Sequence, residues 1–241
     1  MQSPKQAVAA WFGSSKNDAR YLDLWREAPL TYSPDQAIDS EWHVDRYEIV
    51  LGKDTSGDLF QRAGLLTLRN RFYPPQVMVN TSDFQREDRP VRAGDRVLQR
   101  IRILTAWDHP VLEVLTMNEI TEVIDEPRRK GFTYTTTAVH SELGEWAPCV
   151  EWRENGEVVL VIMVVSRTRP GASRLSRRIT RWLQLRAHRL SIMNFKDLLR
   201  GYGLQRSPHT EFVPARVFPA GLLALAAILF LGAVFNISNR K

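Results

Sequence analysis

The sequence lacks the residues on which several common classes of protein depend. Its 241 residues include a single cysteine, Cys149, so the chain can form no internal disulfide bond and no cysteine-based zinc site. The five histidines are scattered along the chain, and we therefore predict no metal site. No phosphate-binding loop, Gly-x-Ser-x-Gly nucleophile motif or dinucleotide-binding fingerprint occurs. We expect no cofactor, and the ordinary share of hydrophobic residues excludes wholesale disorder.

Positive charge is concentrated in one part of the chain. The net charge is +6, yet residues 166–206 hold eleven basic residues, ten of them arginine, and only one acidic residue. Arginine stays charged and binds phosphate groups bidentately, so anionic lipid and nucleic acid are the partners that suit this segment. No helix-turn-helix, zinc finger or RNA-binding aromatic motif accompanies the arginines, which makes nucleic acid the less favoured partner.

A long hydrophobic run near the C-terminus predicts a membrane anchor. Residues 217–235 carry no charge and show no polar face. As a helix they would span about 28 Å, close to the hydrocarbon thickness of a bilayer. We predict a single-pass transmembrane helix, and the upstream arginines favour a cytoplasmic main domain. The alternative is a helix buried in a protein core. The predicted organisation is an N-terminal helical extension, a folded domain, a linker, the transmembrane helix and a polar tail, at residues 1–29, 30–200, 201–216, 217–235 and 236–241.

Hydrophobic periodicity predicts an α+β fold for residues 30–200. A helical pattern near the start and one near the end flank a series of strand patterns. We expect helices at 59–72 and 175–199, and strands at 47–51, 96–107, 111–124, 130–140, 145–153 and 157–166.

Two of the predicted strands differ in polarity. In the strand at 96–107, Val97 and Ile101 share one face with Trp107, whereas Arg96, Arg100 and Arg102 share the other, which we expect to be solvated. The strand at 157–166 is apolar on both faces, which predicts a central position or contact with a membrane.

The last predicted helix combines an apolar stripe with an arginine face. A curved antiparallel sheet wrapped around this helix is one compact solution, and a space between sheet and helix would suit an apolar ligand. The expected apolar stripe consists of Leu175, Ile179, Leu183, Ala187, Leu190, Asn194 and Leu198, and the opposite face carries Arg177, Arg178, Arg181 and Arg186.

Four short motifs resemble those of a known family. Gly131-Phe132-Thr133-Tyr134-Thr135-Thr136 is followed by His140, by Gly144-Glu145 and by Ser166-Arg167…Pro170. This order is similar to the signature of the uncharacterised protein family 0548, over about residues 30–200. The resemblance implies a helix-grip fold of the START and pollen-allergen type, and no established reaction. The sequence departs from the signature at Thr135, where the family usually has glycine.

A polar cluster at the predicted turn between two strands has three possible roles. His140, Glu142 and Glu145 lie there, and Tyr134 shares a strand face with His140. The cluster is interpreted as a polar latch in which Glu145 closes the hairpin, as a ligand contact, or as a catalytic set with His140 and Glu145 as acid–base pair.

The leading hypothesis is a membrane-anchored, non-enzymatic module that binds a lipid-like or other apolar small molecule. The alternatives are an enzyme acting on a hydrophobic substrate and a structural or pore-related membrane protein, although arginines at 96–102 disfavour a lipid-facing sheet. The arginine face of the last helix is expected to rest on anionic lipid headgroups. The predicted ligand-binding residues are Trp107, Phe132, Tyr134, His140, Trp152, Ile179, Leu183 and Leu190.

Overall fold

The computed structural model describes residues 18–36, 39–106 and 109–201. The predicted transmembrane helix at 217–235 and the polar tail lie outside the described residues, as do residues 202–216 of the linker and 1–17 of the N-terminal extension. In the part of the chain that is described, no helix has the length and apolar character needed to span a bilayer.

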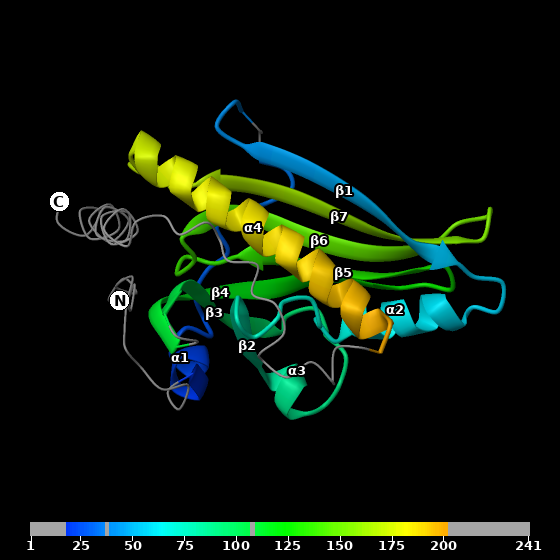
Figure 1. The fold of residues 1–241 in the computed structure, drawn as a ribbon. Helices are drawn as coiled ribbons and strands as arrows, with labels where there is room; N and C mark the ends of the chain where they lie inside the picture. The colour runs from blue at the N-terminus through cyan, green and yellow to red at the C-terminus, as the bar shows by residue number, and fades with distance from the viewer. Residues whose placement is uncertain (1–17, 37–38, 107–108, 202–241) are drawn as a thin grey trace.

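A curved antiparallel sheet of seven strands forms the body of the described structure (Figure 1). The strands follow the order β1-β7-β6-β5-β4-β3-β2, so β1 and β2 form the two edges and β7 lies inside the sheet. The doubly apolar strand is therefore internal, in agreement with the first of its two expected positions. The strands are β1 His43–Lys53, β2 Met78–Ser82, β3 Arg96–Ala106, β4 His109–Asp125, β5 Arg129–Thr136, β6 Glu142–Trp152 and β7 Glu157–Thr168.

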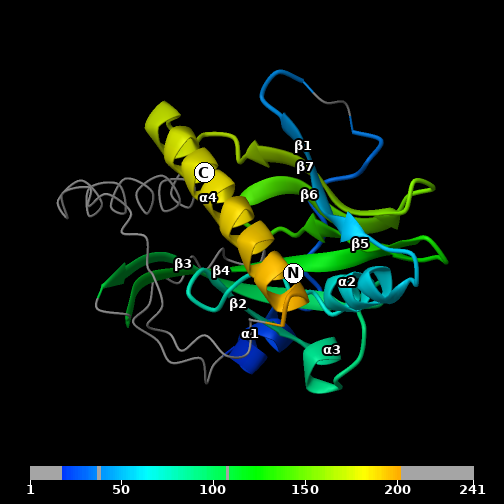
Figure 2. The ribbon, with the colours of Figure 1, turned by 45° about the vertical axis from the view of Figure 1, so that its right-hand side comes forward.

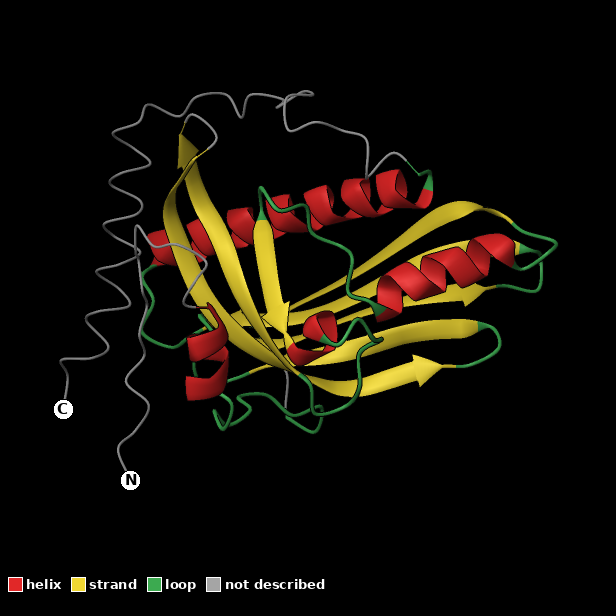
Figure 3. Cartoon of the chain, turned by 90° about the horizontal axis from the view of Figure 1, so that it is seen from below, coloured by secondary structure: helices red, strands yellow, loops and turns green. Residues whose placement is uncertain are grey.

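The long helix α4, Arg174–Leu199, crosses one face of this sheet (Figures 1 and 3). Helix α2, Asp58–Leu68, contacts β5, β6 and α4, and lies at one end of the sheet (Figure 2). Two shorter helices, α1 at Asp18–Leu24 and α3 at Asp83–Arg86, complete the fold. The predicted α+β class, with a curved sheet and a C-terminal helix, is confirmed.

Aromatic packing joins the C-terminal half of α4 to the sheet. The ring of Phe195 stacks on that of Phe72 with centroids 4.8 Å apart, and Phe72 meets Trp146 edge-on at 4.9 Å. All three side chains are almost completely buried, together with Phe132. Large aromatic rings of this kind supply much of the apolar area that a core buries.

Helix α4 presents a different inner face from the predicted one along its length. The buried positions of the helix include Ser176, Thr180, His188 and Ser191, so the face turned to the sheet is offset by one residue from the expected apolar stripe. Leu175, the first member of that stripe, is exposed. The inner face is thus built from small and polar side chains until Phe195 is reached, and such side chains cannot fill the space to the sheet.

The outer face of β3 is covered instead of solvated, which corrects the expectation for Arg100. Helix α1 packs there, with Leu22 and Trp25 against Leu98 of β3. Arg100 is buried beneath α1, where its guanidinium binds both carboxylate oxygens of Asp18 and donates to Glu113 at 2.9 Å. The burial is possible because two acidic partners, one from α1 and one from β4, compensate the desolvation of the charge.

Two short elements, β2 and α3, were absent from the sequence-based prediction, and β5 ends earlier than predicted. Beyond Thr136, the backbone N–H and the hydroxyl of Thr137 both donate to the carbonyl of Met117, at 3.2 and 2.8 Å. The chain then turns through His140, whose N–H donates to the Thr137 carbonyl. His140 therefore belongs to the loop between β5 and β6.

We expect Arg100→Met to lower the free energy of unfolding by about 3–5 kcal/mol, because it leaves the buried carboxylate of Asp18 without its cation and leaves Glu113 with Arg102 alone. Arg86→Met is the matched control: Arg86 is a largely exposed residue of α3, and its loss should cost less than about 1 kcal/mol. Urea unfolding of both variants measures the difference. Equal losses would contradict the role of Arg100 in holding α1 on the sheet.

Candidate ligand-binding site

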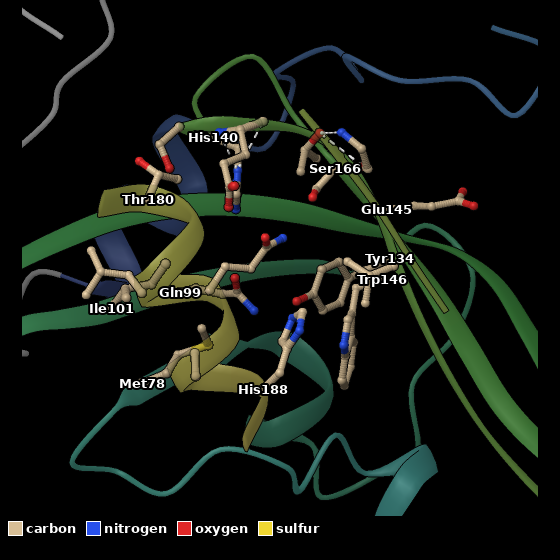
Figure 4. A pocket seen from close by; sticks show the side chains of 18 of the residues that line it. Met78, Gln99, Ile101, Tyr134, His140, Glu145, Trp146, Ser166, Thr180 and His188 are labelled. Atoms are coloured by element: carbon tan, nitrogen blue, oxygen red, sulfur yellow. Dashed lines mark hydrogen bonds between the residues drawn. The ribbon is translucent and has the colours of Figure 1, made fainter. Parts of the chain in front are cut away.

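A cavity of about 120 Å³ lies between the sheet and the N-terminal half of α4 (Figure 4). A volume on the order of 10–15 Å³ suffices for one water molecule, so the cavity has room for a small organic molecule. Strands β3 to β7 and α4 all contribute lining residues. The apolar part of the wall includes Met78, Ile101, Val114, Val164 and Leu183.

The backbone at Gly144 sets the shape of one wall. Gly144 pairs with Ser166 across β6 and β7, and its φ of +135° is rarely adopted by residues with a side chain. A Cβ atom there would lie 1.9 Å from the carbonyl oxygen of Val165, so no larger residue fits. The hydroxyl of Thr136 bonds to the N–H and the carbonyl of Gly144, at 2.9 and 3.2 Å, and fixes this turn of the sheet.

Polar side chains from β3 and β5 meet within the cavity. The amide nitrogen of Asn118 donates to the side-chain oxygen of Gln99 at 2.8 Å, which turns the amide nitrogen of Gln99 away from Asn118. Tyr134 lies beside Gln99 (Figure 4), and its phenol also has Tyr73 as a polar neighbour. Burial raises the pKa of Tyr134 to about 12, so this phenol stays protonated at neutral pH.

Among the acidic side chains of the cavity wall, Glu142 has the pKa that burial raises most. Burial raises the pKa of its carboxyl to about 7, against the opposing effect of the Arg181 guanidinium. Arg181 lies on α4 and binds the Asp45 carboxylate through two bonds of 2.6 Å. Because Asp45 occupies Arg181, the arginine does not neutralise Glu142 directly.

His140 fastens the loop between β5 and β6. Its Nδ1 accepts a hydrogen bond of 3.0 Å from the N–H of Glu142, and its carbonyl accepts one of 2.7 Å from Arg169. Burial, together with the nearby charge of Arg169, lowers the pKa of His140 to about 4. The imidazole is therefore neutral at physiological pH, as its acceptor role requires.

Glu145 forms no hydrogen bond with His140 within the described structure. Its carboxylate points away from the cavity in Figure 4, on the face of β6 where Glu122 and Tyr32 are its electrostatic neighbours. The loop is closed by His140 with Glu142 and by Thr136 with Gly144, whereas the latch expected from the sequence used Glu145. All four residues of the predicted catalytic set contribute to the wall of one cavity, namely Tyr134, His140, Glu142 and Glu145, although the carboxylate of Glu145 points outward.

The predicted ligand-binding residues fall into three groups. Tyr134, His140 and Leu183 line the cavity. Phe132 lies in the aromatic core, Trp152 stacks on Phe60, and Ile179 and Leu190 are half-buried on α4 outside the cavity wall. Trp107 lies outside the described residues.

Sequence reasoning missed the polar lining of Gln99, Ser166, Thr180, Gln184 and His188. Part of this polar lining could have been predicted from the sequence. Thr180, Gln184 and His188 recur every four residues beside the apolar stripe, and a stripe that is polar but uncharged fits a buried site better than a solvated face. Gln99 likewise interrupts the apolar face that Val97 and Ile101 form on β3.

The fold and the cavity together define a helix-grip protein: a curved antiparallel sheet that holds a C-terminal helix over an internal space. The family resemblance inferred from the motifs is confirmed, because residues 28–194 match the model of the DUF1990 family, a domain of unknown function. The chain belongs to that family.

Several solved structures are similar to this chain. An uncharacterised protein from Rhizobium leguminosarum is 15% identical, with a TM-score of 0.41 over 67% of this chain and 96% of its own. Major latex-like protein 151 from Panax ginseng is 10% identical, with a TM-score of 0.39 over 68% and 99%. A protein of unknown function from Staphylococcus aureus is 9% identical, with a TM-score of 0.41 over 69% and 100%. No curated protein matches the sequence.

The raised pKa of Glu142 predicts a specific pH dependence. Between pH 4.5 and about 7 the folded protein retains a proton that the unfolded chain releases, so the contribution of Glu142 to stability falls as pH rises. Glu142→Gln removes this loss. The free energy of unfolding of the variant minus that of the wild type should therefore be about 1–3 kcal/mol larger at pH 8 than at pH 4.

Urea unfolding at a series of pH values measures this gain. Glu154→Gln, in the exposed turn between β6 and β7, is the control and should show no such trend. Parallel pH profiles for wild type and Glu142→Gln would show that Glu142 is not buried in the way described.

Proposed function

We propose that this protein is a membrane-anchored, non-enzymatic module that binds a small, largely apolar molecule between α4 and the sheet. The cavity itself carries the proposal. Protein cores are normally filled to crystal-like density, whereas here α4 turns the short side chains of Thr180 and Ala187 toward the apolar wall and leaves a cavity. A concave, mostly apolar space with a few polar groups is the usual form of a small-molecule site.

The arrangement of His140 and Glu145 favours binding over acid–base catalysis. A general base must reach the proton that it removes, and its accepting atom must be free. The Nδ1 atom of His140 is occupied by the loop backbone, and the carboxylate of Glu145 points away from the cavity. These observations support a role for His140 in shaping the wall.

The proposed tether is the uncharged stretch at 217–235, which follows the arginine-rich segment. Two arginines of α4 already form ion pairs: Arg177 pairs with Glu41, and Arg181 pairs with Asp45. Within the described residues Arg178 and Arg186 form no ion pair, and we assign to them the contact with anionic headgroups, at about 1 kcal/mol each. The main domain would then face the cytoplasm.

Ala187→Phe is expected to abolish binding of the small molecule in the cavity. Ala187 lines the cavity on α4, and a phenyl ring there would occupy the space of the bound molecule. Full-length protein purified from cells is extracted with organic solvent, and mass spectrometry quantifies the molecules released. Leu185→Phe, on the exposed side of the same helix, is the control and should retain them. Identical extracts from the two variants would contradict a ligand in this cavity.

Leu225→Arg combined with Leu229→Arg is expected to move the full-length protein from the membrane fraction to the soluble fraction. Each arginine near the centre of a membrane helix costs about 2.5–3.5 kcal/mol in insertion. Fractionation of cells followed by immunoblotting measures the change, with Leu225→Val and Leu229→Val as the control. A wild-type protein found only in the soluble fraction would contradict the tether, while leaving the cavity unaffected.

A further inference from the structure

Five buried polar atoms on the cavity wall have no hydrogen-bond partner within the described residues. They belong to side chains that are only 1% to 8% exposed. They come from four elements of the wall, namely β3, β6, β7 and α4, and Figure 4 shows their side chains around one space. The atoms are Nε2 of Gln99, Nε1 of Trp146, Oγ of Ser166, Oγ1 of Thr180 and Nδ1 of His188.

Buried polar groups are almost always paired, so this cluster indicates that something else supplies the partners. The amide nitrogen of Gln99 and the indole nitrogen of Trp146 can only donate. The phenol of Tyr134 lies close to Gln99 without a hydrogen bond in good geometry, whereas the nitrogen of Trp146 has no acceptor within the described residues. The hydroxyls of Ser166 and Thr180 can donate or accept. A ligand group that is both acceptor and donor therefore satisfies more of the cluster than a purely apolar molecule does.

The charges around the cavity exclude an anionic ligand group. Within the described residues, no lysine or arginine lines the wall, whereas Glu142 does. The two nearest guanidinium groups are already engaged. Arg181 binds Asp45, and Arg169 donates to the backbone carbonyls of Ala138 and His140. A carboxylate or phosphate in the cavity would face a carboxyl group without a free cation to compensate it.

A cationic group fits less well than a neutral one. An ammonium group carries only donors, so it would leave the donors of Gln99 and Trp146 unpaired. A hydroxyl or carbonyl group can accept from these two nitrogens, and a hydroxyl can also donate to Thr180 or Ser166.

We infer that the ligand is an amphipathic molecule whose neutral hydroxyl or carbonyl group binds the polar cluster around Thr180 and Ser166. Its apolar body lies against Met78, Ile101 and Leu183. This inference rests on the proposed function and adds the chemical class of the ligand. A ligand that displaces ordered water without replacing its hydrogen bonds binds more weakly, so an apolar molecule alone is a poor match for this cluster.

The test compares four probes that share one ring system and differ in a single substituent: naphthalene, 2-naphthol, 2-naphthoate and (2-naphthyl)methylammonium. Full-length protein is held in phosphatidylcholine nanodiscs, and calorimetric titrations are corrected with empty nanodiscs. Wild-type protein should bind 2-naphthol about tenfold more tightly than naphthalene or either charged probe. In Ser166→Ala/Thr180→Val this preference should fall to about threefold or less, with the affinity for naphthalene unchanged.

The double variant is expected to fold, since it removes two buried hydroxyls that have no partner within the described chain. Thr121→Val is the control, because the Thr121 hydroxyl bonds to Thr135 and lies outside the cavity wall. It should keep the wild-type preference.

Each contrary result has a distinct meaning. Equal binding of naphthalene and 2-naphthol overturns the polar subsite and leaves the apolar cavity in place. Tightest binding of 2-naphthoate or of the ammonium probe overturns the neutral ligand group. Binding of none of the four probes contradicts the proposed function itself.

Discussion

The stacking of Phe195 on Phe72 fixes the position of α4, and the cavity depends on it. This contact joins the C-terminal half of the helix to the aromatic core. The ion pair between Arg181 and Asp45 joins its N-terminal half to the edge strand β1. With both halves held, the helix bridges the sheet, and the short side chains of Thr180 and Ala187 leave the space open. A helix with leucine at both of these positions would fill more of it.

The polar cluster on the wall has an energetic cost for the empty protein. A buried donor or acceptor without a partner costs about 1–3 kcal/mol. Glu142 and Tyr134 add further desolvated polar groups to the same wall. Groups that weaken the fold without an evident structural gain are expected where a protein has a function to perform. The concentration of these groups at one cavity is therefore the observation that most supports the proposed binding function.

Much of the fold was predictable from the sequence, because its long elements have strong periodicity. The strand at β3 and the helix at α4 begin and end within a residue of their predicted limits. The short strand β2 was not predictable in this way, since five residues after Pro74-Pro75 contain too little alternation to reveal a strand. The buried Arg100 was missed because its partner Asp18 is distant in the sequence, and periodicity carries no information on such pairs.

The candidate site was predictable only in part. Tyr134 and Leu183 were found because they are large residues on inward-facing positions of β5 and α4. Thr180 and His188 were missed because hydrophobic periodicity assigns polar residues to solvent, and the resulting offset of one residue moved them to the wrong side of α4. Which face of a helix meets a cavity depends on the tertiary contacts at its two ends, and these are formed by residues distant in the chain.

A crystal structure of the full-length protein purified from cells tests the central claim most directly. The account predicts continuous electron density from a non-protein molecule between α4 and the sheet, with one of its polar atoms within hydrogen-bond distance of Thr180 or Ser166. The account would be contradicted by a closed interior in which α4 rests directly on the sheet and both hydroxyls bond to protein atoms.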